Sequence, residues 1–217
     1  MKRKSKVLTL LLFLTLTLGF TFVAYADTNK CSSCHLYSGY WGFTPVNVQY
    51  WSDSSVSMYG YGDGVSNAIS GWNSVQYPSP ILNSTPNESS ANIKFYIAED
   101  KLRSGVGGET FFYKNYGGTW TEISSQVPGT SIDYGIAQVV IDHSNIKDLS
   151  YYGSNFRTWL SGHETGHALG LGHFEFSPIH SGNHWMKTCA DSTSCTQTSP
   201  SSEDKSHLQA KYGPLLP

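Results

Sequence analysis

The chain has 217 residues, of which 39% are hydrophobic and only 14% carry a charge, and its formal net charge is -2 at pH 7. This hydrophobic share is enough for a packed core, and the length predicts one domain or two. The low charge and the 21 glycines argue against a coiled coil and against charge-driven disorder. Nucleic-acid binding is disfavoured as well, because that class needs a concentrated basic surface.

The first 26 residues have the layout of a secretory signal peptide. Four basic residues lie within the first six positions, an apolar run follows up to about Val23, and Ala24-Tyr25-Ala26 is a small-x-small cleavage pattern. The alternative is an uncleaved membrane anchor, but the apolar run is close to the shortest length that spans a bilayer. We therefore expect a secreted, extracellular protein that begins near Asp27. Its 10 basic and 16 acidic residues give it a net charge of -6.

Four cysteines, Cys31, Cys34, Cys189 and Cys195, form an even set. In an oxidising compartment we expect disulfides, and all three possible pairings are open. Covalent haem is one alternative, because Cys31 to His35 fits the C-x-x-C-H attachment pattern, and a zinc ribbon from the two pairs is another. The strand-like residues that follow His35, rich in Tyr and Gly, disfavour a small helical cytochrome.

The rest of the chain mixes the periodicities of strands and helices. In chain order, the pattern predicts a strand at 45–51, a helix over 63–76, a loop over 78–90, strands at 93–97, 110–113, 119–123 and 136–141, and a helix from about 150 to 169. Near the C-terminus Ser201–Asp204 resembles a capping box, which predicts the start of a last helix. Gly213-Pro214 would end that helix.

One histidine-rich segment carries the clearest chemistry in the sequence. His163 and His167 are four residues apart, so on a helix they project from one face and can share a metal ion. Glu164 lies about 100° further round the helix, where it can reach a metal-bound water without being a ligand. Gly170 permits a backbone reversal that brings in His173 as a third ligand. Three His ligands and one water make an open tetrahedral zinc site of the catalytic type.

This segment resembles the metzincin metallopeptidases, whose signature is H-E-x-x-H-x-x-G-x-x-H followed by a Met-turn. The match is residue for residue at His163, Glu164, His167, Gly170 and His173. The order of the expected elements and the ending of the C-terminal helix are most similar to the matrixin branch. A departure from that branch is the Phe at position 174, where matrixins usually carry Ser.

The resemblance implies an α+β fold of the metzincin type. Its features would be a twisted mixed sheet with an antiparallel edge strand, an active-site helix and a C-terminal helix. The implied organisation is a signal peptide at 1–26, a short segment with a cysteine pair at 27–40, and a catalytic domain at 41–217. Met186 is the candidate for the Met-turn, where the family places an apolar floor beneath the three His ligands.

The implied activity is that of a zinc-dependent endopeptidase acting on extracellular proteins. His163, His167 and His173 would hold Zn²⁺ and Glu164 would be the general base. Substrate would lie extended along a sheet edge between Thr110 and Ile123. Residues 187–200 would wall the pocket for the side chain after the cut, and a disulfide between Cys189 and Cys195 would stiffen that wall.

Other readings stay open on the sequence alone. A secreted zinc-binding module without catalysis could keep the same ligands, and a haem protein through Cys31, Cys34 and His35 is a further alternative. We expect neither nucleic-acid partners nor stable membrane insertion after signal cleavage. Asp142, which follows an apolar strand, could bind Ca²⁺ or cap a turn.

Overall fold

The computed structural model describes the histidine-rich segment and most of the chain around it. The described residues are Trp41, 47–76, 79–123, 134–173, 183–189 and 195–212. The expected signal peptide, the C-x-x-C-H segment and the Phe after the third His ligand lie outside them.

Strands and helices alternate along the described chain. They are β1 (Asn47–Ser52), α1 (Ser54–Met58), α2 (Gly62–Asn73), β2 (Ile81–Ser84), the 3₁₀ turn η1 (Glu88–Ser90), β3 (Ile93–Ala98), β4 (Gly108–Tyr116), β5 (Thr119–Glu122), β6 (Ile136–Asp142), α3 (His143–Ile146), α4 (Ser154–Ala168) and α5 (Ser202–Tyr212).

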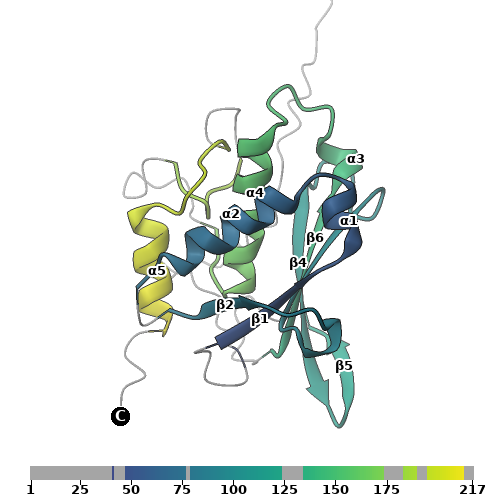
Figure 1. The fold of residues 1–217 in the computed structure, drawn as a ribbon, viewed down its shortest axis with the longest axis vertical. Helices are drawn as coiled ribbons and strands as arrows, with labels where there is room; N and C mark the ends of the chain where they lie inside the picture. The colour runs from purple at the N-terminus through teal and green to yellow at the C-terminus, as the bar shows by residue number, and fades with distance from the viewer. Residues whose placement is uncertain are drawn as a thin grey trace, which may run out of the picture.

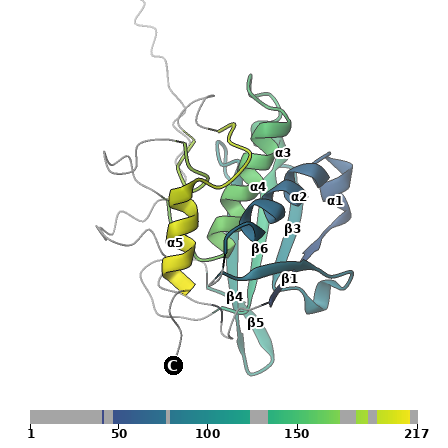
Figure 2. The same cartoon turned by 60° about the vertical axis from the view of Figure 1, so that its left-hand side comes forward.

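The strands form one mixed sheet in the order β2-β1-β3-β6-β4-β5. The first four of these strands are parallel, whereas β4 and β5 run antiparallel at the other side of the sheet. Helices α2 and α4 pack together over the sheet, and α5 lies beyond them (Figure 1). Figure 2 shows α5 separated from the strands by α4. The expected α+β fold, with its antiparallel edge and C-terminal helix, is confirmed.

The longer predicted helices and strands agree with the structure, whereas the short helices α1 and α3 were not predicted. The loop expected over 78–90 is wrong in part, because Ile81–Ser84 is the parallel edge strand β2. The Asn73 side chain explains the pairing: its Oδ1 accepts the Leu82 N–H at 2.8 Å, and its Nδ2 donates to the Leu82 carbonyl at 2.9 Å. Such tertiary contacts leave no trace in a segment of only four residues, which lies among Pro, Asn and Ser.

Helix α4 is the centre of the core. Its side chains are buried almost continuously from Trp159 to Ala168, with the sheet on one side and α2 on the other. Trp72 of α2 donates from its indole nitrogen to the Gly162 carbonyl at 2.8 Å. A fully buried side chain of this size contributes about 1.5–3 kcal/mol relative to an exposed one. Within the described ranges, no helix is long and apolar enough to cross a membrane.

Asp142 caps a turn at the end of β6. Its Oδ1 accepts the N–H and hydroxyl of Ser144, and its Oδ2 accepts the N–H groups of Lys101 and Leu102 at 2.7 and 2.8 Å. Burial raises the pKa of this carboxyl, but the hydrogen bonds outweigh burial and hold the pKa below its ordinary value. The turn-capping alternative is therefore the one that the geometry supports.

Asp142→Asn should destabilise the fold by about 1–3 kcal/mol at pH 7, because an amide replaces one accepting oxygen with a donor. Since the folded pKa lies below the unfolded one, the carboxylate's contribution is complete above about pH 4 and is lost as the pH falls further. Urea unfolding at pH 7 and pH 3 measures both effects. Asp148→Asn, at an exposed position nearby, is the control. Equal stability of the two variants at pH 7 would contradict this role.

Candidate metal centre

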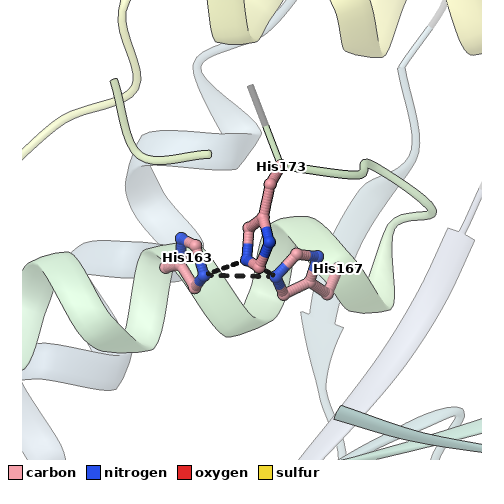
Figure 3. Close-up of side chains that lie close together, drawn as sticks. All are labelled: His163, His167 and His173. Atoms are coloured by element: carbon pink, nitrogen blue, oxygen red, sulfur yellow. Dashed lines mark hydrogen bonds between the residues drawn. The ribbon is translucent and has the colours of Figure 1, made fainter. Parts of the chain in front are cut away.

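Three imidazole rings meet at the C-terminal end of α4. His163 and His167 project from one face of the helix, and His173 returns to them from the following segment (Figure 3). The three Nε2 atoms form a nearly equilateral triangle with edges of 3.0, 3.1 and 2.9 Å. The helix spacing of His163 and His167 and the return of His173 thus bring together the three residues that the sequence singled out.

The return of His173 depends on a tight reversal after α4. Gly170 has a φ of +84°, a backbone conformation that is energetically unfavourable for any residue with a side chain. The Leu171 N–H then bonds to the Gly166 carbonyl at 3.0 Å, which closes the helix end. From α5, the Tyr212 hydroxyl donates to the Leu169 carbonyl at 2.9 Å. The predicted reversal at Gly170 is confirmed.

The outer ring nitrogens of the two helical histidines face carbonyl oxygens. His163 Nδ1 lies 2.5 Å from the Trp185 carbonyl oxygen, and His167 Nδ1 lies 2.8 Å from that of Leu171. A carbonyl oxygen only accepts, so each Nδ1 carries the proton. In a neutral ring, Nε2 then presents a bare lone pair to the centre of the triangle.

This arrangement fits a cation. The Nε2 atoms of His163 and His167 lie 3.1 Å apart, and their lone pairs repel each other unless a positive charge lies between them. Tetrahedral zinc, with Zn–N bonds of about 2.0–2.1 Å, places its nitrogen ligands about 3.3 Å apart. The observed triangle needs to widen by only about 0.3 Å to reach that spacing. Buried imidazole donors with oriented outer nitrogens are what a zinc site uses.

The protonation states also suit metal binding. Burial lowers the pKa of His163 to about 4 and that of His167 to about 3. Burial likewise holds the pKa of His173 well below its ordinary value, and the two neighbouring rings lower it further. A metal ligand must be a neutral imidazole, so all three rings are in the required form near pH 7.

Glu164 lies beside the triangle and is 3% exposed. Its Oε2 accepts from the Thr110 hydroxyl at 2.9 Å, and a Cβ on Gly108 would lie only 2.7 Å from its Oε1. Burial raises the pKa of Glu164 to about 8, against the opposing effect of the Thr110 hydrogen bond. A cation held by the three rings would favour the ionised carboxylate.

Met186 and Trp185 form the floor beneath the ligands. Met186 is fully buried, and its sulfur occupies the space that a side chain at Gly166 would need. Trp185 is also fully buried, and its carbonyl orients His163. The candidate Met-turn therefore packs against α4 at Gly166, next to His167, and its carbonyl side holds His163.

Asp204 fixes this floor from the C-terminal helix. It forms the expected capping box with Ser201: the Ser201 N–H donates to Asp204 Oδ2 at 2.7 Å, and the Asp204 N–H donates to Ser201 Oγ at 3.0 Å. The same carboxylate accepts the N–H groups of Trp185 and Met186 at 2.9 and 3.1 Å. One buried side chain thus connects α5 to the carbonyl that holds His163.

A cavity of about 460 Å³, including its open mouth, adjoins the site. His163 and Glu164 line its inner end. Its walls are mainly apolar, and the side chains that form them are Val106, Ile146, Tyr151, Phe156, Trp159, Leu160, Thr188 and Cys189. The predicted contribution of the segment after Met186 is borne out by Thr188 and Cys189.

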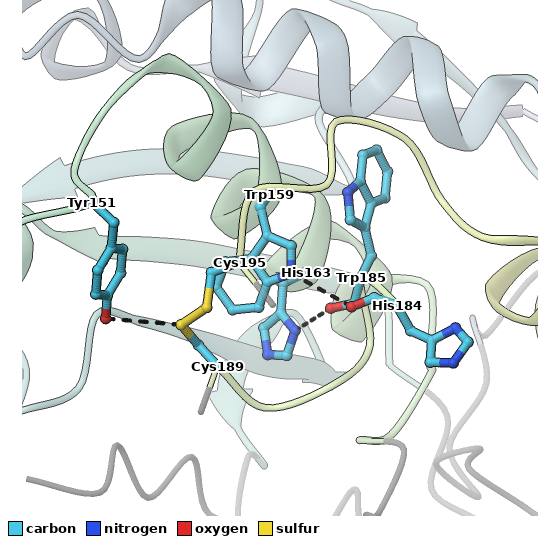
Figure 4. The surroundings of a disulfide bond; sticks show 7 residues. All are labelled: Tyr151, Trp159, His163, His184, Trp185, Cys189 and Cys195. Carbon is cyan, nitrogen blue, oxygen red and sulfur yellow. Dashed lines mark hydrogen bonds between the residues drawn. A yellow bond between two sulfur atoms is a disulfide. The ribbon is translucent and has the colours of Figure 1, made fainter. Parts of the chain in front are cut away.

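A disulfide joins Cys189 to Cys195, which decides among the pairings open to these two residues (Figure 4). The zinc-ribbon alternative is wrong, because both sulfurs are taken. Cys195 is fully buried, and the Tyr151 hydroxyl lies 3.9 Å from Cys189 Sγ. The disulfide therefore holds one wall of the cavity, as the sequence predicted.

The remaining described histidines lie away from the triangle. His184 is 5% exposed and its Nδ1 lies 2.8 Å from Ser201 Oγ, so it supports the floor and is closed to a ligand. His143 packs among tyrosine rings, including Tyr59 at 4.9 Å between centroids, and His207 Nδ1 bonds to a carbonyl within α5.

Three contributors to the site were missed from the sequence: Thr110, the Trp185 carbonyl and the second role of Asp204. The capping-box pattern could point to Asp204, because an Asp at that position has two oxygens and the box uses one. Thr110 had no such signal, since its contact with Glu164 spans 54 positions of the chain.

Sequence comparisons add no relative to this picture. The chain matches no model of a known protein family, and a search of curated proteins gave no match. What can be said of the site therefore depends on its own residues: a buried three-His group able to hold a metal ion, on a helix and the segment after it, with a carboxylate beside it.

Zinc should raise the midpoint of thermal unfolding, because a ligand that binds only the folded state stabilises it. His173→Ala should lower zinc affinity more than about 100-fold, since loss of a direct ligand exceeds the 10–100-fold cost of losing an outer partner. Competition with a chromophoric chelator measures this. His207→Ala is the control, and an equal loss of affinity there would contradict the assignment.

Asp204→Asn should lower zinc affinity about 10-fold, because its amide cannot keep every bond to the Trp185–Met186 turn, and His163 loses its fixed orientation. The fold should lose about 1–3 kcal/mol. Asp63→Asn, the same exchange at an exposed position of α2, is the control for charge. Chelator competition and urea unfolding separate the two effects; unchanged zinc affinity would show that the turn does not depend on Asp204.

Proposed function

We propose that the protein is a secreted, zinc-dependent endopeptidase of the metzincin type, with 1–26 as its export signal and 41–217 as its catalytic domain. The observation that carries the proposal is the triangle of His Nε2 atoms with Glu164 at its side and a cavity adjoining both. A closed structural zinc site would have four protein ligands. Three ligands, an adjacent buried carboxylate and a cavity are the features of a catalytic site.

The residues of the chain divide the chemistry of hydrolysis among themselves. His163, His167 and His173 would hold zinc, which when bound acts as a Lewis acid toward the scissile carbonyl and makes water more acidic. Glu164 takes a proton from the water whose oxygen attacks the carbonyl carbon. The C–N bond then breaks, and Glu164 returns the proton to the leaving amine. Thr110 holds one carboxylate oxygen, which orients the other.

The cavity supports a preference for an apolar side chain next to the scissile bond. Its walls include Phe156, Trp159 and Leu160, and Glu164 at its inner end is the one acidic or basic side chain among the described residues that line it, His163 being neutral. An apolar group entering it leaves water, which stabilises the complex. Charged side chains would lose their hydration there without finding a partner.

Glu164→Gln should lower kcat by about 10²–10⁴-fold, because the amide cannot carry the proton. Zinc should stay bound, since Glu164 is not a ligand. The measurement is digestion of a peptide library with and without a chelator, read by mass spectrometry, together with zinc content. Glu99→Gln, on the exposed surface, is the control.

The digestion distinguishes a peptidase from a zinc-binding module without catalysis. Chelator-sensitive cleavage that Glu164→Gln abolishes supports the peptidase. A wild-type protein that binds zinc and cleaves no peptide would overturn it in favour of a zinc-binding interaction module.

A further inference from the structure

The outer edge of β4 is covered along only part of its length. Strand β5 pairs with Tyr113–Tyr116, and the Ile123 N–H extends this pairing by donating to the Phe112 carbonyl at 2.8 Å. On its other side β4 pairs with β6 over Gly108–Tyr113. Figure 1 shows the β4–β5 hairpin projecting beyond the other strands. The edge from Gly108 to Phe111 has no strand beside it among the described residues.

The hydrogen-bond pattern identifies the backbone groups at this free edge. Residues of an antiparallel strand direct their N–H and C=O alternately to its two neighbours. The bond between Phe112 and Ile123 directs the even-numbered residues of β4 outward, and the odd-numbered Tyr113 accepts from Gly135 on the β6 side. Gly108 and Thr110 therefore present their backbone groups to the outer edge, two positions apart.

This free edge lies directly beside the candidate catalytic residues. The Thr110 hydroxyl contacts the Glu164 carboxylate, and Gly108 is packed against it. Just before β4, Gly105–Gly107 line the cavity. A peptide in line with β5, antiparallel to β4 as β5 is, would have its N-terminal side toward Phe112 and its C-terminal side toward the cavity. Antiparallel pairing is also the more stable arrangement per residue.

We propose that β5 and Ile123 act as a stop for the substrate backbone, so that the sheet edge binds at most about three residues before the scissile bond. This inference rests on the proposed peptidase function. The substrate class is an extended peptide that pairs with Thr110 and Gly108. Beyond Thr110, the edge of β4 is already paired with Ile123 and β5. Substrate residues further upstream therefore leave the sheet and add no backbone hydrogen bonds.

The test is a ladder of peptides with one cleavage site, a constant segment after it, and one to eight residues before it. With the unmodified protein and zinc, kcat/KM should rise with each residue up to about three upstream residues. Longer peptides should then differ in kcat/KM by less than about threefold, which is less than the gain that one further pair of backbone hydrogen bonds would give. A second ladder, lengthened only after the scissile bond, controls for peptide length. A continued rise of tenfold or more from three to eight upstream residues would overturn the stop.

A pair of proline variants tests β5 itself. Thr121 faces Lys114 in the ladder at a hydrogen-bonded position, so Thr121→Pro removes a bond between β5 and β4. Glu122→Pro is the matched control, because its N–H points away from β4. Only Thr121→Pro should let upstream residues beyond the third raise kcat/KM. Identical ladders for the two folded variants would overturn the role of β5.

If Thr121→Pro does not fold, the ladder on the unmodified protein still decides. Cleavage whose rate is independent of upstream length beyond three residues supports the stop, and cleavage that accelerates with length overturns the stop alone. Absence of cleavage of every peptide overturns the proposed function, and this inference with it.

Discussion

Three imidazole nitrogens turned toward one point form the constraint on which the rest of the site depends. Neutral imidazoles do not assemble in this way by themselves, because the inward lone pairs of His163 and His167 repel each other and have left water. The surrounding structure holds them there: carbonyls of Trp185 and Leu171 fix two rings, and the reversal at Gly170 returns the third. Binding a cation relieves this cost, so the site is prepared for a metal before one arrives.

Holding the rings requires support from distant parts of the chain. His163 depends on the Trp185 carbonyl, and that turn depends in its own right on Asp204 in α5. A carboxylate that accepts several backbone N–H groups is well satisfied even when it is fully buried. The same principle applies to Asp142, whose two oxygens tie the chain after β3 to the end of β6.

The sequence alone predicted the three histidines of the candidate metal centre and the helix α4 that carries two of them, because both depend on local spacing. A turn of helix places His163 and His167 on one face, and a single glycine accounts for the return to His173. The same local logic predicted the capping box at Ser201. It failed where a contact spans the chain. Strand β2 is defined by its neighbour β1 and by the Asn73 side chain, and Thr110 reaches Glu164 only because β4 packs against α4.

The bonds from Asp204 to the Trp185–Met186 turn also determine when the site can assemble. The ligands are complete once the chain has been synthesised to His173, yet the group that fixes the floor beneath them follows 31 positions later, within the last helix described. A chain still emerging during synthesis or export would carry every ligand and lack the contact that sets the orientation of His163. Synthesis and docking of α5 are then the event that turns three histidines into a rigid chelate.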